Sequence, residues 1–266
     1  MKKLLIILFV LSGTSLMFAQ TNNFEKIKLS GTKSLVTKSY TVENGKRYIL
    51  ETKRFAFDSN GNVTSVRFDS PGFFNEIDYT YDAKGKMTYE KMYNLGKVIR
   101  SYKYEYNKSG KKIYASSFNL SEDVDMETVY EYDEKGNLLK EETESGKRKF
   151  GFKYTYDKNS RKTDMVVYNP TQIEKKFYCY YDDKGLLIEE KGVFYWAGNK
   201  NAKHNNFSRK SFSYNENSQL KEMDCYITDE LYEKYLYTYK SNGLLSKWEK
   251  YNTEEKLSYV VEYDYE

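Results

Sequence analysis

The feature that most constrains this chain is a short motif that returns about every 25 residues. The motif is an aromatic residue, any residue, a second aromatic residue, Asp or Asn, two variable residues and Gly. Its copies read FAFDSNG, YTYDAKG, YEYNKSG, YEYDEKG, YTYDKNS, CYYDDKG, FSYNENS and YTYKSNG, and a last half-copy, YDY, stands near the end. Repetition at a fixed period indicates an architecture built from equivalent supersecondary units.

The second aromatic residue of each copy measures the period. These residues stand at 57, 81, 106, 132, 156, 181, 214, 239 and 265, so the intervals are 24, 25, 26, 24, 25, 33, 25 and 26 residues. One interval is longer by about eight residues, and the extra residues fall near 191–211. We therefore interpret 20–266 as a single domain of about nine repeats with one insertion.

Each repeat predicts two strands and two turns. In the fourth copy, Tyr130 and Tyr132 share one face of a strand, and Glu131 points to the other face. At the turn that follows, Gly136 supplies a positive φ, and the Asp133 carboxylate accepts backbone N–H groups. Signals for a second turn come about ten residues later in most copies, at Asn44-Gly45, Ser70-Pro71-Gly72, Asn94-Leu95-Gly96, Ser145-Gly146, Asn169-Pro170 and Thr228-Asp229. The pattern predicts an antiparallel meander.

The alternation of residues predicts which face of the sheet is covered. Aromatic residues gather on one face, and charged residues gather on the other. About eighteen strands at ~4.8 Å would make a flat sheet ~85 Å wide, which is wider than twisted open sheets usually are. The predicted fold class is all-β, an antiparallel hairpin array that forms a curled sheet, a solenoid or a partial shell. In this arrangement Tyr130, Tyr132, Tyr154 and Tyr156 are expected to be buried.

The first nineteen residues lie outside the repeats. Lys2 and Lys3 precede an apolar run from Leu4 to Val10, and small or neutral residues lead to Ala19. This order is typical of a signal peptide cleaved near Ala19, so 1–19 is predicted to be removed on export. The sequence predicts a secreted, periplasmic or cell-surface protein in a bacterium, with no integral membrane segment after cleavage.

Composition agrees with an exported β-protein and excludes some partners. The chain has 29 Tyr and 15 Phe, which favour strands. Its net charge is +4, or +2 without Lys2 and Lys3, and the two signs are interspersed. Neither nucleic acid nor an anionic membrane is therefore expected as a partner. Counted from their turns, Cys179 and Cys225 have opposite parity, which favours opposite faces and two free thiols over a disulfide.

The motif resembles the YD repeat of the Rhs family of bacterial surface and secreted proteins. The matching residues are the aromatic pair with its Asp and Gly, followed by an Asn-Leu pair, as in Asp133, Gly136, Asn137 and Leu138. The resemblance implies a hollow β-shell, which in large members encloses a C-terminal toxin. Here no toxin domain is expected after Glu266. The self-cleaving Asp-Pro pair of that family is absent, because both prolines follow Ser or Asn.

Two other repeat families have a similar rhythm. Choline- and glucan-binding repeats depend on regular Trp, and this chain has only Trp196 and Trp248. The MORN-variant repeats of some antitoxin proteins also alternate aromatic strands with Asn-Gly turns, so an antitoxin or interaction protein stays open as an alternative.

The search for catalytic chemistry selects no residues. The single histidine, His204, has no nucleophile signature beside it, and no Cys or His pair has the spacing of metal ligands. No catalytic, cofactor or metal site is therefore predicted. Carboxylate pairs suited to glycoside cleavage are not selected by the sequence among its 39 acids, and a glycosidase is the least favoured alternative.

The insertion is the one segment that departs from the repeat. It is rich in basic and aromatic residues, and the candidate ligand-binding residues are Tyr195, Trp196, His204 and Arg209. Insertions in repeat proteins often carry binding groups, and aromatic rings beside basic donors suit a sugar or a protein partner. The competing interpretation is a longer hairpin whose aromatic residues only cover the core. The regular tyrosines are likewise interpreted as core in preference to a glycan-binding platform.

The sequence thus predicts a non-enzymatic exported repeat protein that acts as a binding or structural module at the cell envelope or outside the cell. Its partner is expected to be an envelope or extracellular protein or a glycan. The alternative binding function is carbohydrate recognition by the 191–211 insertion.

Overall fold

The structure is a computed structural model that describes residue 27 and residues 30–69, 75–194 and 207–266. The described chain folds into eighteen β-strands. They are β1 (Ser34–Glu43), β2 (Lys46–Phe57), β3 (Val63–Phe68), β4 (Glu76–Tyr81), β5 (Met87–Asn94), β6 (Lys97–Tyr106), β7 (Lys112–Phe118), β8 (Val124–Tyr132), β9 (Leu138–Ser145), β10 (Arg148–Tyr156), β11 (Lys162–Asn169), β12 (Gln172–Tyr181), β13 (Leu187–Phe194), β14 (Phe207–Tyr214), β15 (Leu220–Ile227), β16 (Glu230–Tyr239), β17 (Leu245–Tyr251) and β18 (Leu257–Tyr265).

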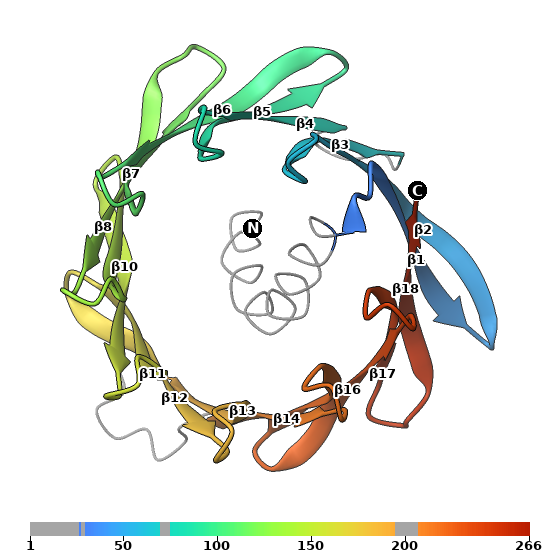
Figure 1. Cartoon of the computed structure of the whole chain (residues 1–266). Coiled ribbons are helices and arrows are strands. Elements are labelled where there is room, and N and C mark those ends of the chain that lie inside the picture. Colours follow the sequence, from blue (N-terminus) through green and yellow to red (C-terminus); the bar gives the residue numbers. More distant parts are fainter. Residues whose placement is uncertain (1–26, 28–29, 70–74, 195–206) are drawn as a thin grey trace.

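The strands form one closed barrel. Each strand pairs antiparallel with the next in sequence, and β18 pairs with β1, from Leu35 opposite Tyr265 to Thr41 opposite Tyr259. Figure 1 shows the resulting ring, seen along its axis. The all-β hairpin array predicted from the repeat is confirmed. The sequence predicted a curled sheet, a solenoid or a partial shell, whereas the observed sheet closes fully on itself. Closure gives the edge strands partners and removes the exposed edges of an open sheet.

Closure also gives the last strand a partner on each side. In an open sheet the segment Val261 to Tyr265 would be an edge strand, free to receive a strand from a partner. It instead lies within β18 and is bonded to both β17 and β1. Backbone groups of this segment are therefore already used within the barrel.

In seven of the eight copies the Asp or Asn of the motif closes the short turn at one end of the hairpin. In the fourth copy the Asp133 carboxylate accepts the Asn137 backbone N–H at 2.7 Å and its side-chain amide at 2.8 Å. The Asp133 N–H donates to the Asn137 carbonyl, and the Gly136 N–H donates to the Asp133 carbonyl, both at 2.9 Å. The same backbone pair recurs at all eight motif turns, and it is the pattern of a type I turn followed by a bulge residue with positive φ.

The recurring Gly occupies that bulge position. Gly136 has φ +84°, and its equivalents in five other copies have φ between +73° and +83°. Ser160 and Ser218, which replace Gly in two copies, keep the same turn and also have positive φ, 62° and 57°. The prediction of positive φ is confirmed. The two serine copies keep the turn type and place a residue with a Cβ in the left-handed region.

The second aromatic residue links each repeat to the one before it. When this residue is Tyr, its hydroxyl donates to the backbone carbonyl of the first residue in the preceding return strand. The eight bonds, of 2.6–2.9 Å, are Tyr81 to Val63, Tyr106 to Met87, Tyr132 to Lys112, Tyr156 to Leu138, Tyr181 to Lys162, Tyr214 to Leu187, Tyr239 to Leu220 and Tyr265 to Leu245. Phe57 holds this position in the first copy. The bond explains why eight of the nine copies use Tyr rather than Phe.

The aromatic face lines the inside of the barrel. A cavity of about 490 Å³ is lined by residues of this face from seven neighbouring strands, β17, β18 and β1 to β5. One cavity can contact so many neighbouring strands of a closed barrel only from the inside. Glu131 points outward and is exposed, as predicted, and Lys153 and Thr155 are exposed in the same way. Tyr130, Tyr132, Tyr154 and Tyr156 are half-buried rather than buried, because they face the interior of a wide barrel.

The core of the barrel lies in one sector of the inner wall. Leu35, Tyr237, Leu245, Trp248 and Tyr263 are buried there together with Ile27, which is fully buried. All of them except Ile27 come from β1 and β16 to β18, next to the closure. The sector from β5 to β12 has fewer buried side chains per strand.

Replacing Gly136 with Val tests the turn. A β-branched residue at φ +84° should lower the free energy of unfolding by about 1–2 kcal/mol, because the left-handed region is strained for it. Chemical denaturation followed by circular dichroism measures the loss. Lys135→Val, at the neighbouring exposed position of the same turn, is the control, and an equal loss in both variants contradicts this account of the glycine.

Replacing Tyr132 with Phe tests the link between repeats. The Lys112 carbonyl then loses its hydroxyl donor, and the free energy of unfolding should fall by about 1 kcal/mol. Tyr180→Phe is the control because Tyr180 points outward and is 45% exposed. If both variants are as stable as the parent, the hydroxyl bond does not hold the repeats together.

Candidate functional site

A β-bulge in each return strand decides which residues reach the inner wall. In β9, Leu138 lies opposite Tyr132, and Lys140 lies opposite Glu131, so Leu139 is the extra residue. The bulge reverses the alternation, and Glu141 therefore lies opposite Tyr130 on the inner wall. Equivalent shifts follow the motif turn in the other copies. The inner wall thus receives the sixth and ninth residues after the second aromatic residue.

These two inner positions carry alternating charges on one side of the barrel. We call six inner residues the charged row: Glu90 on β5, Lys112 on β7, Glu141 on β9, Lys162 on β11, Glu190 on β13 and Lys210 on β14. Lys210 enters the row from the neighbouring strand, opposite Glu190. In the copies near the closure the same positions hold Val63, Val66, Leu220, Met223, Leu245 and Trp248. These two positions are therefore all apolar near the closure, whereas from β5 to β13 half of them are charged and the rest hold Met87, Ala115, Leu138, Met165 and Leu187.

Tyrosine rings lie between the charges. Glu90 lies opposite Tyr79 on one side and Tyr102 on the other, and the Tyr104 hydroxyl donates to Glu90 Oε2 at 3.1 Å. Lys112 Nζ lies 4.2 Å from the centre of the Tyr104 ring and 5.7 Å from that of Tyr130. An ammonium over an aromatic face is attracted by the ring quadrupole. Lys112 is thus held by two rings between two carboxylates.

Burial shifts the pKa values of this group. Loss of hydration raises the pKa of Glu90 and of Glu141, and the Lys112 ammonium offsets part of the rise. The same desolvation lowers the pKa of Lys112, partly offset by the two carboxylates. Desolvation also raises the pKa of Tyr104 and Tyr130, so both hydroxyls stay protonated donors. The ionised forms of all five groups are therefore less favourable here than in water. For Glu90 and Glu141 the ionised form is the carboxylate present at neutral pH.

Both cysteines belong to the inner wall near the end of the charged row. Cys179 lies opposite Glu190, and Cys225 lies opposite Lys210, so the prediction of opposite faces is wrong. The reason is the bulge at Lys221, which reverses the alternation between the turn and Cys225. Both thiols are free, since two strands separate them. Burial raises the pKa of each thiol to about 11, so both are protonated at neutral pH.

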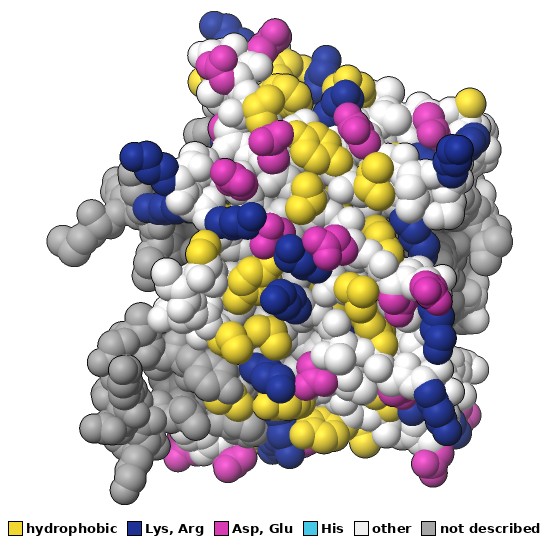
Figure 2. Space-filling model, turned by 90° about the vertical axis from the view of Figure 1, so that its left-hand side faces the viewer, with side chains coloured by type: hydrophobic (Ala, Val, Ile, Leu, Met, Phe, Trp, Pro, Cys, Tyr) yellow, Lys and Arg dark blue, Asp and Glu magenta, His cyan; other side chains and the backbone are white. Residues whose placement is uncertain are grey.

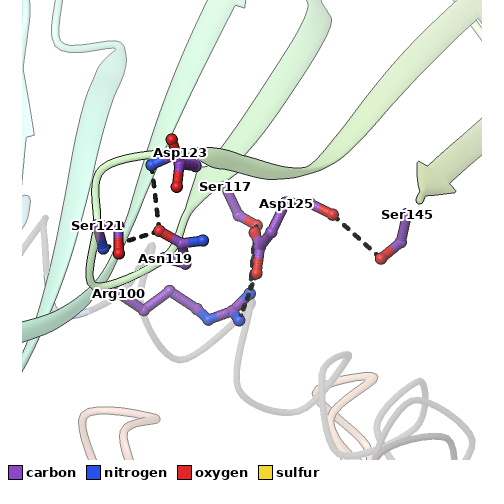
Figure 3. Close-up of polar contacts among 7 residues, drawn as sticks. All are labelled: Arg100, Ser117, Asn119, Ser121, Asp123, Asp125 and Ser145. Atoms are coloured by element: carbon purple, nitrogen blue, oxygen red, sulfur yellow. Dashed lines mark hydrogen bonds and ion pairs between the residues drawn. The ribbon is translucent and has the colours of Figure 1, made fainter.

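A second polar cluster lies beside the turn that joins β7 to β8 (Figure 3). The Arg100 guanidinium on β6 donates to Asp125 Oδ2 at 2.7 Å and to Ser117 Oγ at 3.2 Å. Ser117 also bonds Asp125, and the Ser145 hydroxyl donates to the Asp125 carbonyl at 3.1 Å. Asp125 is the bulge residue of β8. These contacts join four neighbouring strands, β6 to β9, and hold the bulge residue in place, which explains the cluster as a structural feature.

Three of the residues predicted in the insertion, Tyr195, Trp196 and His204, lie outside the described residues. Arg209 lies on β14 and points outward. Its guanidinium stacks 3.8 Å from the centre of the Tyr226 ring and lies 3.6 Å from Glu189. Arg209 is thus held by neighbours on the outer wall, away from the charged row.

Sequence reasoning missed the charged row because strict alternation places Glu90 and Glu141 on the wrong face. One signal was present. The ninth residue after the second aromatic residue is Val66, Ala115, Met165, Met223 or Trp248 in the other copies, which marks an inner column interrupted by three Glu. No group of three or more His, Cys, Asp or Glu suited to a metal ion occurs among the described residues. Within that same part of the chain, no helix is long and apolar enough to cross a membrane.

Comparison with known proteins gives only remote similarities. No protein-family model matches the chain, and no curated protein matches it. A segment of the Photorhabdus luminescens Tc holotoxin pore is 15% identical, with a TM-score of 0.38 over 82% of this chain and 14% of the toxin chain. A porin-like protein from Bacteroides uniformis is 9% identical, with a TM-score of 0.45 over 88% of this chain and 96% of its own.

A putative exported protein with a YmcC-like fold from Bacteroides fragilis is 11% identical, with a TM-score of 0.22 over 87% of this chain and 94% of its own. The chain spans about one seventh of the Tc toxin chain, which is the 14% given above. At TM-scores this low, none of these similarities carries an argument about function.

Replacing Glu141 with Gln tests the electrostatics of the charged row. The pKa of Glu141 is higher in the folded chain than in the unfolded chain, where it is about 4.3. Its contribution to stability is therefore present below about pH 4.3 and is lost as pH rises through the folded pKa. The Gln variant should unfold at a higher temperature than the parent at neutral pH, and this gain should shrink toward pH 4.

Thermal unfolding between pH 4 and pH 8 measures the effect. The outward Glu131→Gln is the control. Its unfolding temperature should not exceed that of the parent by an amount that shrinks toward pH 4. A Glu141→Gln variant that is less stable than the parent at neutral pH would show that Glu141 supports the fold instead.

Proposed function

We propose that this chain is an exported, non-enzymatic repeat barrel of the YD type that binds a ligand against its inner wall. The signal-peptide pattern in 1–19 supports export to the envelope or beyond it. The motif around Asp133 and Gly136 supports the YD assignment, since the turn that it forms is the structural unit of every repeat. The charged row, of which every member except the buried Glu190 is partly exposed, supports the binding site.

The observation that carries this proposal is the contrast between the two sides of the inner wall. Near the closure the sixth and ninth residues after the second aromatic residue are all apolar, and all of them except Val63 are buried, as stability requires. From β5 to β13 half of these positions hold charged residues, Glu90, Lys112, Glu141, Lys162 and Glu190, and desolvation makes ionisation of the first three less favourable. Groups that a fold keeps at a cost in stability are typical of functional sites.

The outer wall has the composition of a surface in water. Cross-strand ion pairs cover it, such as Lys140 with Glu131 at 3.2 Å and Lys234 with Glu222 at 3.2 Å. Figure 2 shows basic and acidic side chains interspersed among apolar ones over this surface. A Lys or Arg that faces the middle of a bilayer costs about 2–4 kcal/mol. We therefore place the outer wall in water and the ligand inside.

The spacing of the acids favours binding over glycoside cleavage. Glycosidases hold two carboxyl groups on either side of one bond, about 5–10 Å apart. Glu90 and Glu141 lie on β5 and β9, so four strand spacings, ~19 Å of backbone, separate them. Lys112 stands between them. This arrangement supports a row of contacts along a ligand rather than a pair of catalytic acids.

A retention experiment tests the proposed function. The chain from residue 20 is immobilised and exposed to envelope and culture-medium extracts of its source bacterium, and bound material is identified by mass spectrometry. The inner variant carries Glu90→Gln and Glu141→Gln, and the matched outer variant carries Glu105→Gln and Glu131→Gln. We expect the parent and the outer variant to retain the same material and the inner variant to lose it. No specific retention by the parent, or equal retention by all three proteins, refutes binding at the inner wall.

A further inference from the structure

We infer that the ligand of the charged row is a neutral oligosaccharide, a proposal that rests on the proposed function. The relevant surface is the inner wall from β4 to β13. It presents Tyr79, Tyr104, Tyr130 and Tyr154 as one series of half-exposed rings, with Glu90, Lys112, Glu141 and Lys162 between and beside them. Each part of this surface restricts the chemistry of the molecule that fits it.

The charges require a polar ligand with little net charge. The row alternates in sign, so a strongly anionic or cationic ligand would meet repulsion from every second group. An apolar ligand would cover Glu90, Lys112 and Glu141 without offering hydrogen bonds, and a charged group that loses water without a partner is very costly. A neutral molecule rich in hydroxyl groups avoids both problems, because hydroxyls donate to carboxylates and accept from ammonium groups.

The rings require a ligand with repeated flat apolar faces. Successive tyrosines of the series come from every second strand, so their backbones are ~9.6 Å apart, roughly the length of a disaccharide unit. The C–H faces of pyranose rings are weakly positive and suit the negative faces of aromatic rings. Ring spacing and alternating polar groups therefore match a linear chain of sugars laid across the strands.

The backbone of the wall favours a sugar over a peptide. Every described strand is bonded on both sides, so the wall offers no strand edge to an extended peptide. The remaining contacts come from side chains, with Tyr104 and Glu90 already joined at 3.1 Å and Lys112 over the Tyr104 ring at 4.2 Å. These fixed groups form an ordered surface before any ligand arrives, which limits the entropy lost on binding.

Titration with defined oligosaccharides tests the inference. The probes are neutral hexasaccharides of the malto, cello, xylo and manno series, with hexagalacturonate and the chitosan hexamer as anionic and cationic counterparts, and a mixture of random decapeptides. Calorimetry and the change in intrinsic fluorescence report binding. We expect at least one neutral series to bind the parent, and the two charged hexamers and the peptides to bind at least tenfold more weakly.

Two pairs of matched variants locate the binding. The Glu90→Gln, Glu141→Gln variant should lose affinity by about tenfold for each carboxylate that bonds a hydroxyl, whereas Glu105→Gln, Glu131→Gln should bind like the parent. Tyr154→Leu keeps an apolar side chain but removes a ring and should lose affinity several-fold, whereas the outward Tyr180→Leu should not. Circular dichroism of each variant confirms that the barrel is folded.

The outcomes separate the inference from the proposed function. If no neutral hexasaccharide binds, or if a charged hexamer or the peptides bind best, the inference is wrong. The proposed function still stands in that case if the retention experiment shows loss in the inner variant alone. If a neutral hexasaccharide binds all variants equally, the inner wall is not its site and the inference is also wrong.

Discussion

The pairing of β18 with β1 is the interaction on which the rest of this structure depends. It joins residues more than two hundred positions apart, from Leu35 opposite Tyr265 to Thr41 opposite Tyr259. Without it, eighteen strands would expose two edges and leave the aromatic face open to solvent. With it, the aromatic face becomes the inner wall of a barrel, and the same tyrosines that link the repeats also line an interior. Any site on that wall exists only because the sheet is closed.

Much of the fold could be predicted from the repeat itself. The Asp133 to Gly136 turn, the outward position of Glu131 and the number of strands follow from local rules of turn chemistry and alternation. Closure could not be predicted in this way, because strand tilt and twist, rather than any residue of the motif, decide whether a sheet meets its own edge. The hydroxyl bond of Tyr132 to the Lys112 carbonyl was also hidden, since it joins two repeats rather than residues within one.

The charged row escaped prediction for a more specific reason. A single bulge residue, such as Leu139 or Lys221, shifts the register by one and moves every later residue of that strand to the other face. The same shift made the predicted face of Cys225 wrong, and it would place Glu141 on the outer wall if alternation were strict. Of the four residues predicted for the insertion, Arg209 is held on the outer wall by Tyr226 and Glu189, and the other three lie outside the described residues. Comparing equivalent positions across copies is a safer guide than alternation within one strand.

The charged row is proposed to be an accessible surface inside the barrel that a ligand covers. Carboxylate footprinting with a water-soluble carbodiimide and an amine, read by peptide mass spectrometry, tests this directly. It compares the parent protein alone with the parent protein bound to the material that it retains in the retention experiment. Bound material should slow labelling of Glu90 and Glu141 and leave labelling of the outward Glu105 and Glu131 unchanged. Equal labelling of the two inner carboxylates in both samples, or protection confined to the outer pair, would contradict it.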